Sequence, residues 1–279
     1  MKCPLAFSTV ASMTATPDEI IAAAKRAGMS AVEIRLENDG SVFSYPAEEL
    51  PALGDKFRAA GLQISDLGTS GPVTGYSENK IAVAKRDLKT ASLIGAGAIR
   101  LFLGAFSKTF SGYPQHDYAG VVRSLQEICA EGKALGVEVW AETHNMFSTG
   151  KVLSQLIRDV GADNFRIIWD LMHPWEMGEK PEETAAYLTD RIAHVHIKDG
   201  VPKDDPDAAT YLYTKLGEGS VPIADSLRAL EKIGYRGYLS LEWENAWRPE
   251  IQNCFASLDE ILRHYTDYLK TVMPDGDAG

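Results

Sequence analysis

The sequence predicts a single α/β domain folded as a parallel, eight-stranded (β/α)8 barrel. Short apolar runs rich in β-branched residues alternate with longer amphipathic segments, eight of each, and no linker or change in composition interrupts the series. The 279 residues divide into about 35 per unit, which suits one strand, one helix and their loops. A doubly wound open sheet is the alternative architecture. We assign the barrel to residues 1–273 and expect residues 274–279 to form a flexible C-terminal tail.

Each element has its own local signal. The first strand is expected at 4–9, where Leu5, Ala6 and Phe7 are apolar and the following Ser8 interrupts any signal-peptide core. The other strands are expected at 31–36, 62–67, 98–103, 137–142, 166–171, 192–198 and 238–243. The helices are expected at 17–28, 46–60, 78–95, 117–135, 151–160, 181–190, 222–234 and 256–270. Helix starts and stops agree with these ranges: a Thr-Pro-Asp-Glu segment begins at Thr16, and glycines stand where helices should end, at Gly28, Gly61, Gly136 and Gly234.

Composition and charge narrow the classes of function. Hydrophobic residues make up 45% of the chain and charged residues 24%, which is typical of a soluble globular protein. The net charge of −11 repels nucleic acid and anionic membranes, so neither is expected as a partner. No apolar stretch is long enough to span a membrane. Three scattered cysteines, Cys3, Cys129 and Cys254, form neither a disulfide framework nor a metal pair, which favours a cytoplasmic location.

Polar side chains are predicted to face the barrel interior. On each of the last four strands one alternating set is apolar and suits the helix-facing side, while the opposite set is largely polar. The polar sets are Glu138, Trp140, Glu142; Arg166, Ile168, Asp170; His194, His196, Lys198; and Ser240, Glu242, Glu244. Four of these lie near the C-terminal ends of their strands: Glu142, Asp170, His196 and Glu242. Catalytic residues of (β/α)8 barrels come from that end.

Several uncompensated carboxylates in a cavity of low dielectric constant repel one another, so the cluster implies raised pKa values or a bound cation. Three carboxylates and one imidazole suit Mn²⁺ or Mg²⁺ and tolerate Co²⁺ or Zn²⁺. Interior ion pairs are the alternative for any one of these residues. We expect a buried charge network lower in the barrel from Arg100, Glu138 and Arg166, and a structural role for His194.

Five segments in the second half resemble the xylose isomerase-like TIM barrels, also called sugar phosphate isomerases/epimerases. They are Trp140-Ala-Glu-Thr-His144, Trp169-Asp-Leu-Met-His173, His194-Val-His-Ile-Lys-Asp199, Leu216-Gly-Glu-Gly219 and Leu239-Ser-Leu-Glu242. The first half resembles the family through its βα rhythm and through Val32-Glu33-Ile34-Arg35. The resemblance implies one divalent metal held by Glu142, Asp170, His196 and Glu242, with Glu142 and Glu242 as the acid/base pair. It also implies substrate contacts from His173 and Lys198, and it makes a homo-oligomer an expectation.

The chemistry that fits is proton transfer next to a carbonyl. A metal chelated by the carbonyl and hydroxyl of a keto-sugar stabilises an enediolate, and a carboxylate moves the proton. The leading hypothesis is therefore an isomerase or epimerase of a small-molecule carbohydrate, a keto-sugar or related polyhydroxy ketone; a dehydratase is the close alternative. Further candidates for contact with substrate complete the set: His144, Arg35, Trp175 and Phe7, with Phe102 and Trp247 as other aromatic candidates. A phosphate on the substrate stays open, with Arg35, Lys108 and Lys198 as candidate ligands.

Two rival classes remain. An endonuclease IV-like nuclease needs histidines on the third and fourth strands, and the segments Leu62–Gly68 and Ile99–Gly104 have none. A sugar-binding protein without turnover is the other rival, because a fold does not guarantee a function. The loops 104–116 and 199–221 are long enough to be lids.

Overall fold

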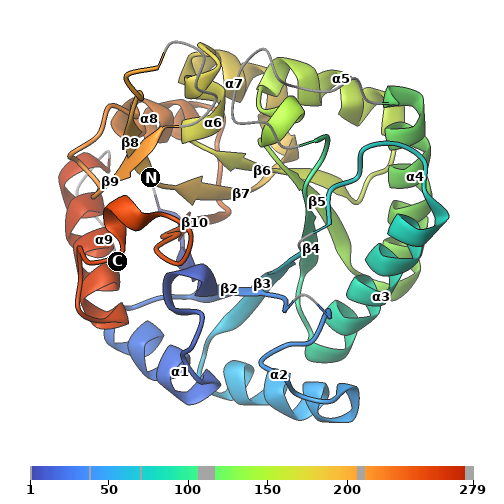
Figure 1. Ribbon diagram of the computed structural model, residues 1–279, viewed down its shortest axis with the longest axis horizontal. Helices are drawn as coiled ribbons and strands as arrows, with labels where there is room; N and C mark the ends of the chain where they lie inside the picture. Colours follow the sequence, from blue (N-terminus) through green and yellow to red (C-terminus); the bar gives the residue numbers. More distant parts are fainter. Residues whose placement is uncertain (1, 38, 70, 106–116, 206–210, 274–279) are drawn as a thin grey trace.

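The computed structural model describes residues 2–37, 39–69, 71–105, 117–205 and 211–273, and these form a closed parallel barrel with helices around it (Figure 1). The strand order around the barrel is β1-β10-β7-β6-β5-β4-β3-β2, and β1 pairs in parallel with both β10 and β2 to close it. The barrel strands are β1 (Leu5–Ser8), β2 (Ala31–Arg35), β3 (Gln63–Gly68), β4 (Ala98–Leu101), β5 (Glu138–Glu142), β6 (Phe165–Asp170), β7 (Ile192–Ile197) and β10 (Tyr238–Leu241). The predicted single (β/α)8 barrel is confirmed, and the open sheet is excluded.

The helices form the outer ring in Figure 1. They are α1 (Pro17–Arg26), α2 (Leu50–Ala59), α3 (Glu78–Ile94), α4 (Tyr118–Leu135), α5 (Gly150–Val160), α6 (Met172–Glu176), α7 (Pro181–Leu188), α8 (Ile223–Lys232) and α9 (Leu258–Val272). Short 3-10 helices cover Thr9–Ser12, Ala47–Glu49, Asn145–Phe147, Thr189–Arg191 and Pro249–Ile251. The sequence predicts every one of the long helices, but not the short helix α6.

Helix ends follow the local signals in the sequence. At the start of α1, the Thr16 hydroxyl accepts a hydrogen bond from the Glu19 backbone N–H, and the Glu19 carboxylate accepts one from the Thr16 N–H. At the end of α4, Gly136 has a φ of +70°, a left-handed conformation that glycine adopts without steric cost.

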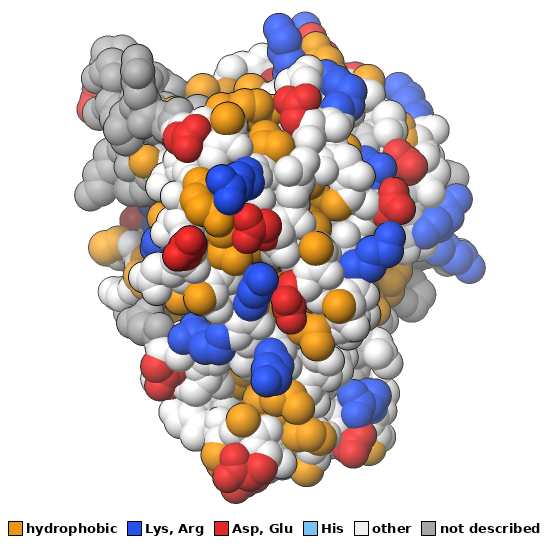
Figure 2. All heavy atoms as spheres, turned by 90° about the vertical axis from the view of Figure 1, so that its right-hand side faces the viewer, with side chains coloured by type: hydrophobic (Ala, Val, Ile, Leu, Met, Phe, Trp, Pro, Cys, Tyr) orange, Lys and Arg blue, Asp and Glu red, His pale blue; other side chains and the backbone are white. Residues whose placement is uncertain are grey.

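The main hydrophobic core lies between the barrel wall and the helices. It is built from the apolar alternating sets, such as Val139, Ile167 and Val195, packed against apolar helix residues such as Leu125 and Leu153. The outer faces of the helices are charged: Figure 2 looks onto the side that is on the right in Figure 1 and shows acidic and basic side chains interspersed. Among the described residues, none of the helices is both long enough and apolar enough to cross a membrane.

The connection after β7, predicted only as a loop, contains an antiparallel hairpin. Its strands are β8 (Asp199–Val201) and β9 (Leu212–Thr214). The predicted C-terminal tail, residues 274–279, and Lys108 lie outside the described residues, as does most of the loop 104–116.

Candidate active site

Four strands deliver the candidate metal ligands to one point at the C-terminal end of the barrel. Glu142 and Asp170 are the last residues of β5 and β6, His196 lies on β7, and Glu242 directly follows β10. All four side chains are buried, and each offers a ligand atom within 4.8 Å of those of the other three. The structure therefore brings together the whole predicted ligand set.

The donor atoms of this cluster suit a divalent cation. The Nδ1 atom of His196 lies 3.1 Å from Glu142 Oε1, 3.5 Å from Glu242 Oε2 and 4.0 Å from Asp170 Oδ2. Glu142 Oε2 and Asp170 Oδ2 are buried, and among the described residues their close polar contacts are ion pairs rather than well-aligned hydrogen bonds. Three carboxylates and an imidazole match the ligands that Mg²⁺, Mn²⁺ or Zn²⁺ take.

Two basic side chains from the barrel itself also face the carboxylates. Arg100 Nη1 lies 3.2 Å from Glu142 Oε2. Lys198 Nζ lies 2.9 Å from Asp170 Oδ2 and 2.7 Å from Glu242 Oε2. The expectation that these carboxylates are uncompensated is therefore wrong, and electrostatic repulsion alone does not require a metal.

The ion pairs determine how the carboxyl groups titrate. Burial opposes the ionisation of Glu142, but Arg100 and His196 hold its pKa below the usual value. Burial acts on Glu242 in the same way, and Lys198 and His196 keep its pKa well below the usual value. Both glutamates are therefore carboxylates at neutral pH, the form that binds a cation and accepts a proton.

Arg100 lies higher in the barrel than the sequence predicts. The predicted lower network of Arg100, Glu138 and Arg166 divides into two parts. Glu138 and Arg166 pair at 3.7 Å at the N-terminal end of the barrel and are partly exposed. Arg100 instead pairs with Glu142, because its long side chain reaches past the level of its own Cα toward the mouth.

His173 and His144 lie next to the cluster, as predicted for groups that contact substrate. Their rings are in edge-to-face contact, with centroids 4.5 Å apart. The Nδ1 atom of His173 is 2.9 Å from Glu176 Oε2, while its buried Nε2 has no hydrogen-bond partner among the described residues. Burial and the neighbouring His173 lower the pKa of His144 to about 4, so the imidazole of His144 is neutral at physiological pH.

A pocket of about 460 Å³ opens beside the cluster. Its wall includes the predicted residues Arg35, His144 and Glu242 and the aromatic candidates Phe102 and Trp247. Arg35 lies with its Cζ 5.8 Å from the centroid of the half-exposed Trp247 ring. Arg100 also lines the pocket, which therefore has charged, aromatic and hydrogen-bonding groups around one space.

Four of the six predicted substrate contacts do not line this pocket. His173 and Lys198 instead contact Asp170 of the cluster, and the other two, Phe7 and Trp175, lie away from both. Phe7 is fully buried in the core between the barrel and the helices. It pairs in register with Leu241 of β10 and so belongs to the helix-facing set. Trp175, on the short helix α6, packs against the same core. Neither residue lines the pocket in the structure.

The hairpin after β7 brings Tyr213 to the site, a residue that the sequence does not predict there. Tyr213 of β9 is buried, and its hydroxyl donates a hydrogen bond to Glu244 Oε1, which is also 3.1 Å from Lys198 Nζ. Arg248 donates to the Tyr213 oxygen from 3.1 Å. Glu244 belongs to the alternating set of the last strand that is predicted to face inward, whereas no pattern in the sequence predicts that Tyr213 lies here.

The Leu216-Gly-Glu-Gly219 segment has a structural role near the site. The carboxylate of Asp199 accepts hydrogen bonds from the backbone N–H groups of Gly200, Gly217, Gly219 and Val221. A Cβ at Gly219 would overlap this carboxylate. The two glycines thus let the loop close around Asp199 and fix the end of the connection that carries Lys198 and the hairpin.

Comparison with known proteins agrees with this architecture. Residues 21–268 match the family model described as xylose isomerase-like TIM barrel. Among curated relatives, an uncharacterised protein of Methanocaldococcus jannaschii is 26% identical over 171 residues, 59% of this chain and 54% of that protein. The uncharacterised protein YihM of Escherichia coli is 24% identical over 229 residues, 78% of this chain and 63% of YihM. The chain thus spans less than two-thirds of the length of both relatives.

Solved structures share the fold at low identity. The IolI protein, whose structure contains a bound zinc atom, superposes with a TM-score of 0.79 at 17% identity over 99% of this chain and 100% of IolI. D-psicose 3-epimerase gives a TM-score of 0.77 at 18% identity over 97% of this chain and 99% of the epimerase. The "probable 3-DHS dehydratase AsbF" of Bacillus anthracis gives 0.71 at 18% identity over 94% of this chain and 98% of AsbF.

Proposed function

The chain belongs to the xylose isomerase-like TIM barrel family, and from this premise we propose that it is a divalent-metal-dependent isomerase or epimerase of a keto-sugar or related polyhydroxy ketone. The observation that carries the proposal is the convergence of Glu142, Asp170, His196 and Glu242 within 4.8 Å at the barrel mouth. The likeness to an epimerase and to a zinc-containing structure supports it.

The four ligands would hold one cation, with Mn²⁺ or Mg²⁺ favoured by the three carboxylates and Zn²⁺ or Co²⁺ also compatible. A cation bound there would polarise the substrate carbonyl and make the neighbouring C–H more acidic. The carboxylate cluster is buried in the barrel, and its Glu242 lines the pocket of about 460 Å³. A pocket of this size suits a small polyhydroxy molecule.

Glu142 and Glu242 would exchange the proton from two sides of the substrate. They come from β5 and from the end of β10, and β6 and β7 separate these strands in the barrel wall. One carboxylate would remove the proton from carbon, and the other would deliver a proton to the opposite face. This gives an epimer; delivery to the adjacent carbon gives an isomer.

The surrounding residues would orient the substrate and keep the carboxylates ionised. His173 is held at Nδ1 by Glu176, so its Nε2 would face a substrate oxygen. Lys198 lies against Glu242 and Glu244 at the same mouth and would contact a hydroxyl or carbonyl oxygen. Arg100 would keep Glu142 charged through the reaction cycle.

The test is incubation of the Mn²⁺-loaded protein in D₂O with a panel of ketoses, inososes and their phosphates, read by NMR and mass spectrometry. We expect deuterium at one carbon next to the carbonyl of one substrate class, and exchange about 10²–10⁴-fold slower with Glu142→Gln or Glu242→Gln. Loss of water from the substrate would identify a dehydratase instead. Binding of a sugar without any exchange would replace the proposal with a binding protein, and cleavage of abasic DNA with three zinc ions per chain would replace it with a nuclease.

A further inference from the structure

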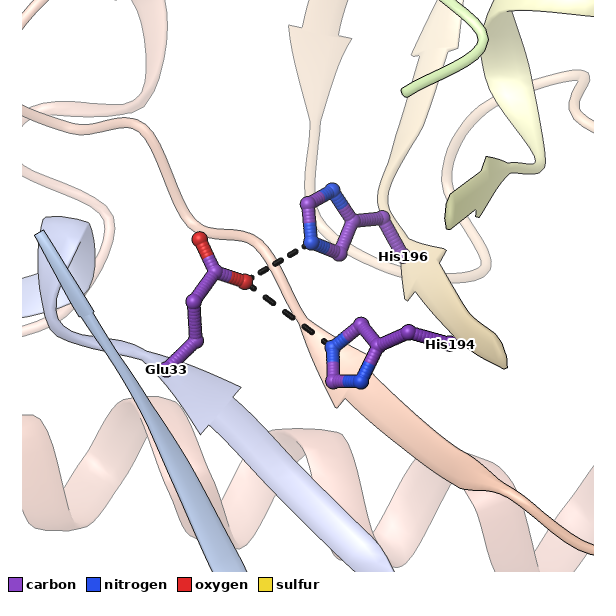
Figure 3. A group of neighbouring side chains, drawn as sticks. All are labelled: Glu33, His194 and His196. Atoms are coloured by element: carbon purple, nitrogen blue, oxygen red, sulfur yellow. Dashed lines mark hydrogen bonds and ion pairs between the residues drawn. The ribbon is translucent and has the colours of Figure 1, made fainter. Parts of the chain in front are cut away.

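The Nε2 atom of His196 contacts Glu33 (Figure 3), whereas Nδ1 of the same ring faces the carboxylate cluster. From this contact we infer that Glu33 is a positioning residue that fixes the tautomer and orientation of His196 for cation binding. The inference rests on the metal site of the proposed function and assigns a role to a residue of β2, on the opposite side of the barrel from β6.

Each ring nitrogen of His196 lies close to a different carboxylate. His196 Nε2 is 2.7 Å from Glu33 Oε2, and His196 Nδ1 is 3.1 Å from Glu142 Oε1. An imidazole that binds a cation is neutral, with one N–H and one lone pair. Since ionised Glu33 can only accept, it holds the proton on Nε2 and leaves the Nδ1 lone pair directed at the cluster. Histidine ligands in metal sites commonly donate their other N–H to a carboxylate in this way.

Glu33 is itself held in place, which a positioning role requires. Its other oxygen, Oε1, accepts a hydrogen bond of 3.1 Å from the Ser8 hydroxyl and lies 3.9 Å from Arg100 Nη2. Ser8 and Glu33 are partners in the register of β1 and β2, and the Glu33 side chain is fully buried. One carboxylate oxygen of Glu33 is therefore fixed by Ser8 of the barrel wall, and the other is positioned to accept a hydrogen bond from His196.

A second cation held by Glu33, His194 and His196 is the competing interpretation, because these three side chains also lie together (Figure 3). The distances favour the hydrogen bond. Two ligands about 2.1 Å from a tetrahedral ion are about 3.4 Å apart, whereas Glu33 Oε2 and His196 Nε2 are 2.7 Å apart. His194 Nε2 is farther away, 3.9 Å from Glu33 Oε2, and its ring stacks on Trp140 with centroids 5.5 Å apart.

The first experiment measures Mn²⁺ affinity and stoichiometry by calorimetry for wild type, Glu33→Gln and the control Asp66→Asn. Asp66 is an equally buried carboxylate on the neighbouring strand β3, but the hydrogen bond it accepts comes from Ser65. We expect Glu33→Gln to weaken Mn²⁺ binding about 10–100-fold and Asp66→Asn to stay close to wild type. Wild-type affinity in Glu33→Gln would overturn the inference.

The second experiment needs no variant and so does not depend on whether Glu33→Gln folds. In the Zn²⁺-loaded wild type labelled with ¹⁵N-histidine, we expect the NMR signals of His196 to show a protonated Nε2 and a metal-bound Nδ1. A proton on Nδ1 would overturn the inference. So would two Mn²⁺ ions per wild-type chain that fall to one in both Glu33→Gln and His194→Gln, because Glu33 would then be a ligand.

These outcomes separate the two proposals. If the wild-type protein binds no divalent cation, both the metal site of the proposed function and the role of Glu33 are wrong. If the wild-type protein and Glu33→Gln bind one cation equally well, only the role of Glu33 is wrong.

Discussion

The mouth and the base of the barrel are built from the same strands but use charged residues differently. At the mouth, Glu142 pairs with Arg100 at 3.2 Å, and their side chains are 1% and 2% exposed. At the base, Glu138 lies four residues earlier on β5 and pairs with Arg166 at 3.7 Å, with 37% and 31% exposure. The same kind of ion pair is thus buried at one end and solvated at the other.

This difference indicates which end has a function. Removing charges from water costs several kcal/mol per ion, so a buried pair is weak evidence for stability and is retained for another reason. A solvated pair contributes little in either direction. The mouth concentrates buried carboxylates with their basic partners, whereas the base has one pair screened by water.

The largest expected effect is on catalysis. Glu142→Gln and Glu242→Gln should each lower the rate of solvent deuterium exchange by about 10²–10⁴-fold, because each removes a group that carries the proton. Glu138→Gln, the same substitution on the same strand at the base, is the control and should keep wild-type exchange. An equal loss in Glu138→Gln would show that the two ends do not differ as we describe.

The next effect is on stability at the mouth. In metal-free protein, Arg100→Gln should lower the free energy of unfolding by about 3–5 kcal/mol, since it leaves Glu142 buried without the guanidinium that pairs with it. Urea denaturation with a chelator present measures this loss. Addition of Mn²⁺ should recover part of the stability, because a cation then compensates the same carboxylate. A variant as stable as wild type in chelator would show that Arg100 does not hold Glu142.

The sequence predicts the barrel and the ligand set because both depend on short-range patterns. Alternation along β5, β6, β7 and β10 assigns each residue to one face, and parallel strands bring their C-terminal ends to one edge. That rule places Glu142, Asp170, His196 and Glu242 inward at one end, and the family resemblance implies their role as metal ligands.

Alternation along a strand does not predict how far a long side chain reaches along the barrel axis, or how a loop folds. Arg100 is level with Trp140 in the β4–β5 register, one layer below Glu142, and only its extended side chain reaches the mouth. Parity therefore places Arg100 inside but too low. Tyr213 reaches the mouth because the β8–β9 hairpin folds back over it, a long-range arrangement without a periodic signal. The prediction that Phe7 contacts substrate has a different weakness: its strand is too short for the alternation to show which face Phe7 is on.

The layer between mouth and base should respond to pH. His194 is buried against Trp140, and burial with the nearby His196 lowers its pKa to about 3, from the ordinary value of 6.5. Below pH 6.5 the unfolded chain therefore binds a proton at this residue that the folded protein does not, so stability falls as the pH falls toward 3. Between pH 7.5 and 5.5 the loss from His194 should be about 1.4 kcal/mol. His194→Gln should be less sensitive to pH by that amount in urea denaturation, and an identical pH profile would contradict a neutral buried His194.

The smallest effect is expected at the base. Glu138→Gln keeps an oxygen that can accept the 2.7 Å hydrogen bond from Trp140 Nε1 and removes only the charge that faces Arg166. Because this pair is partly exposed, its loss should cost less than about 1 kcal/mol, and the cost should shrink further at high salt. Urea denaturation at low and high salt, in parallel with Arg100→Gln, gives the comparison directly. A loss at the base as large as that at the mouth, and insensitive to salt, would mean that the Glu138–Arg166 pair is shielded from water and that burial does not distinguish the two ends of the barrel.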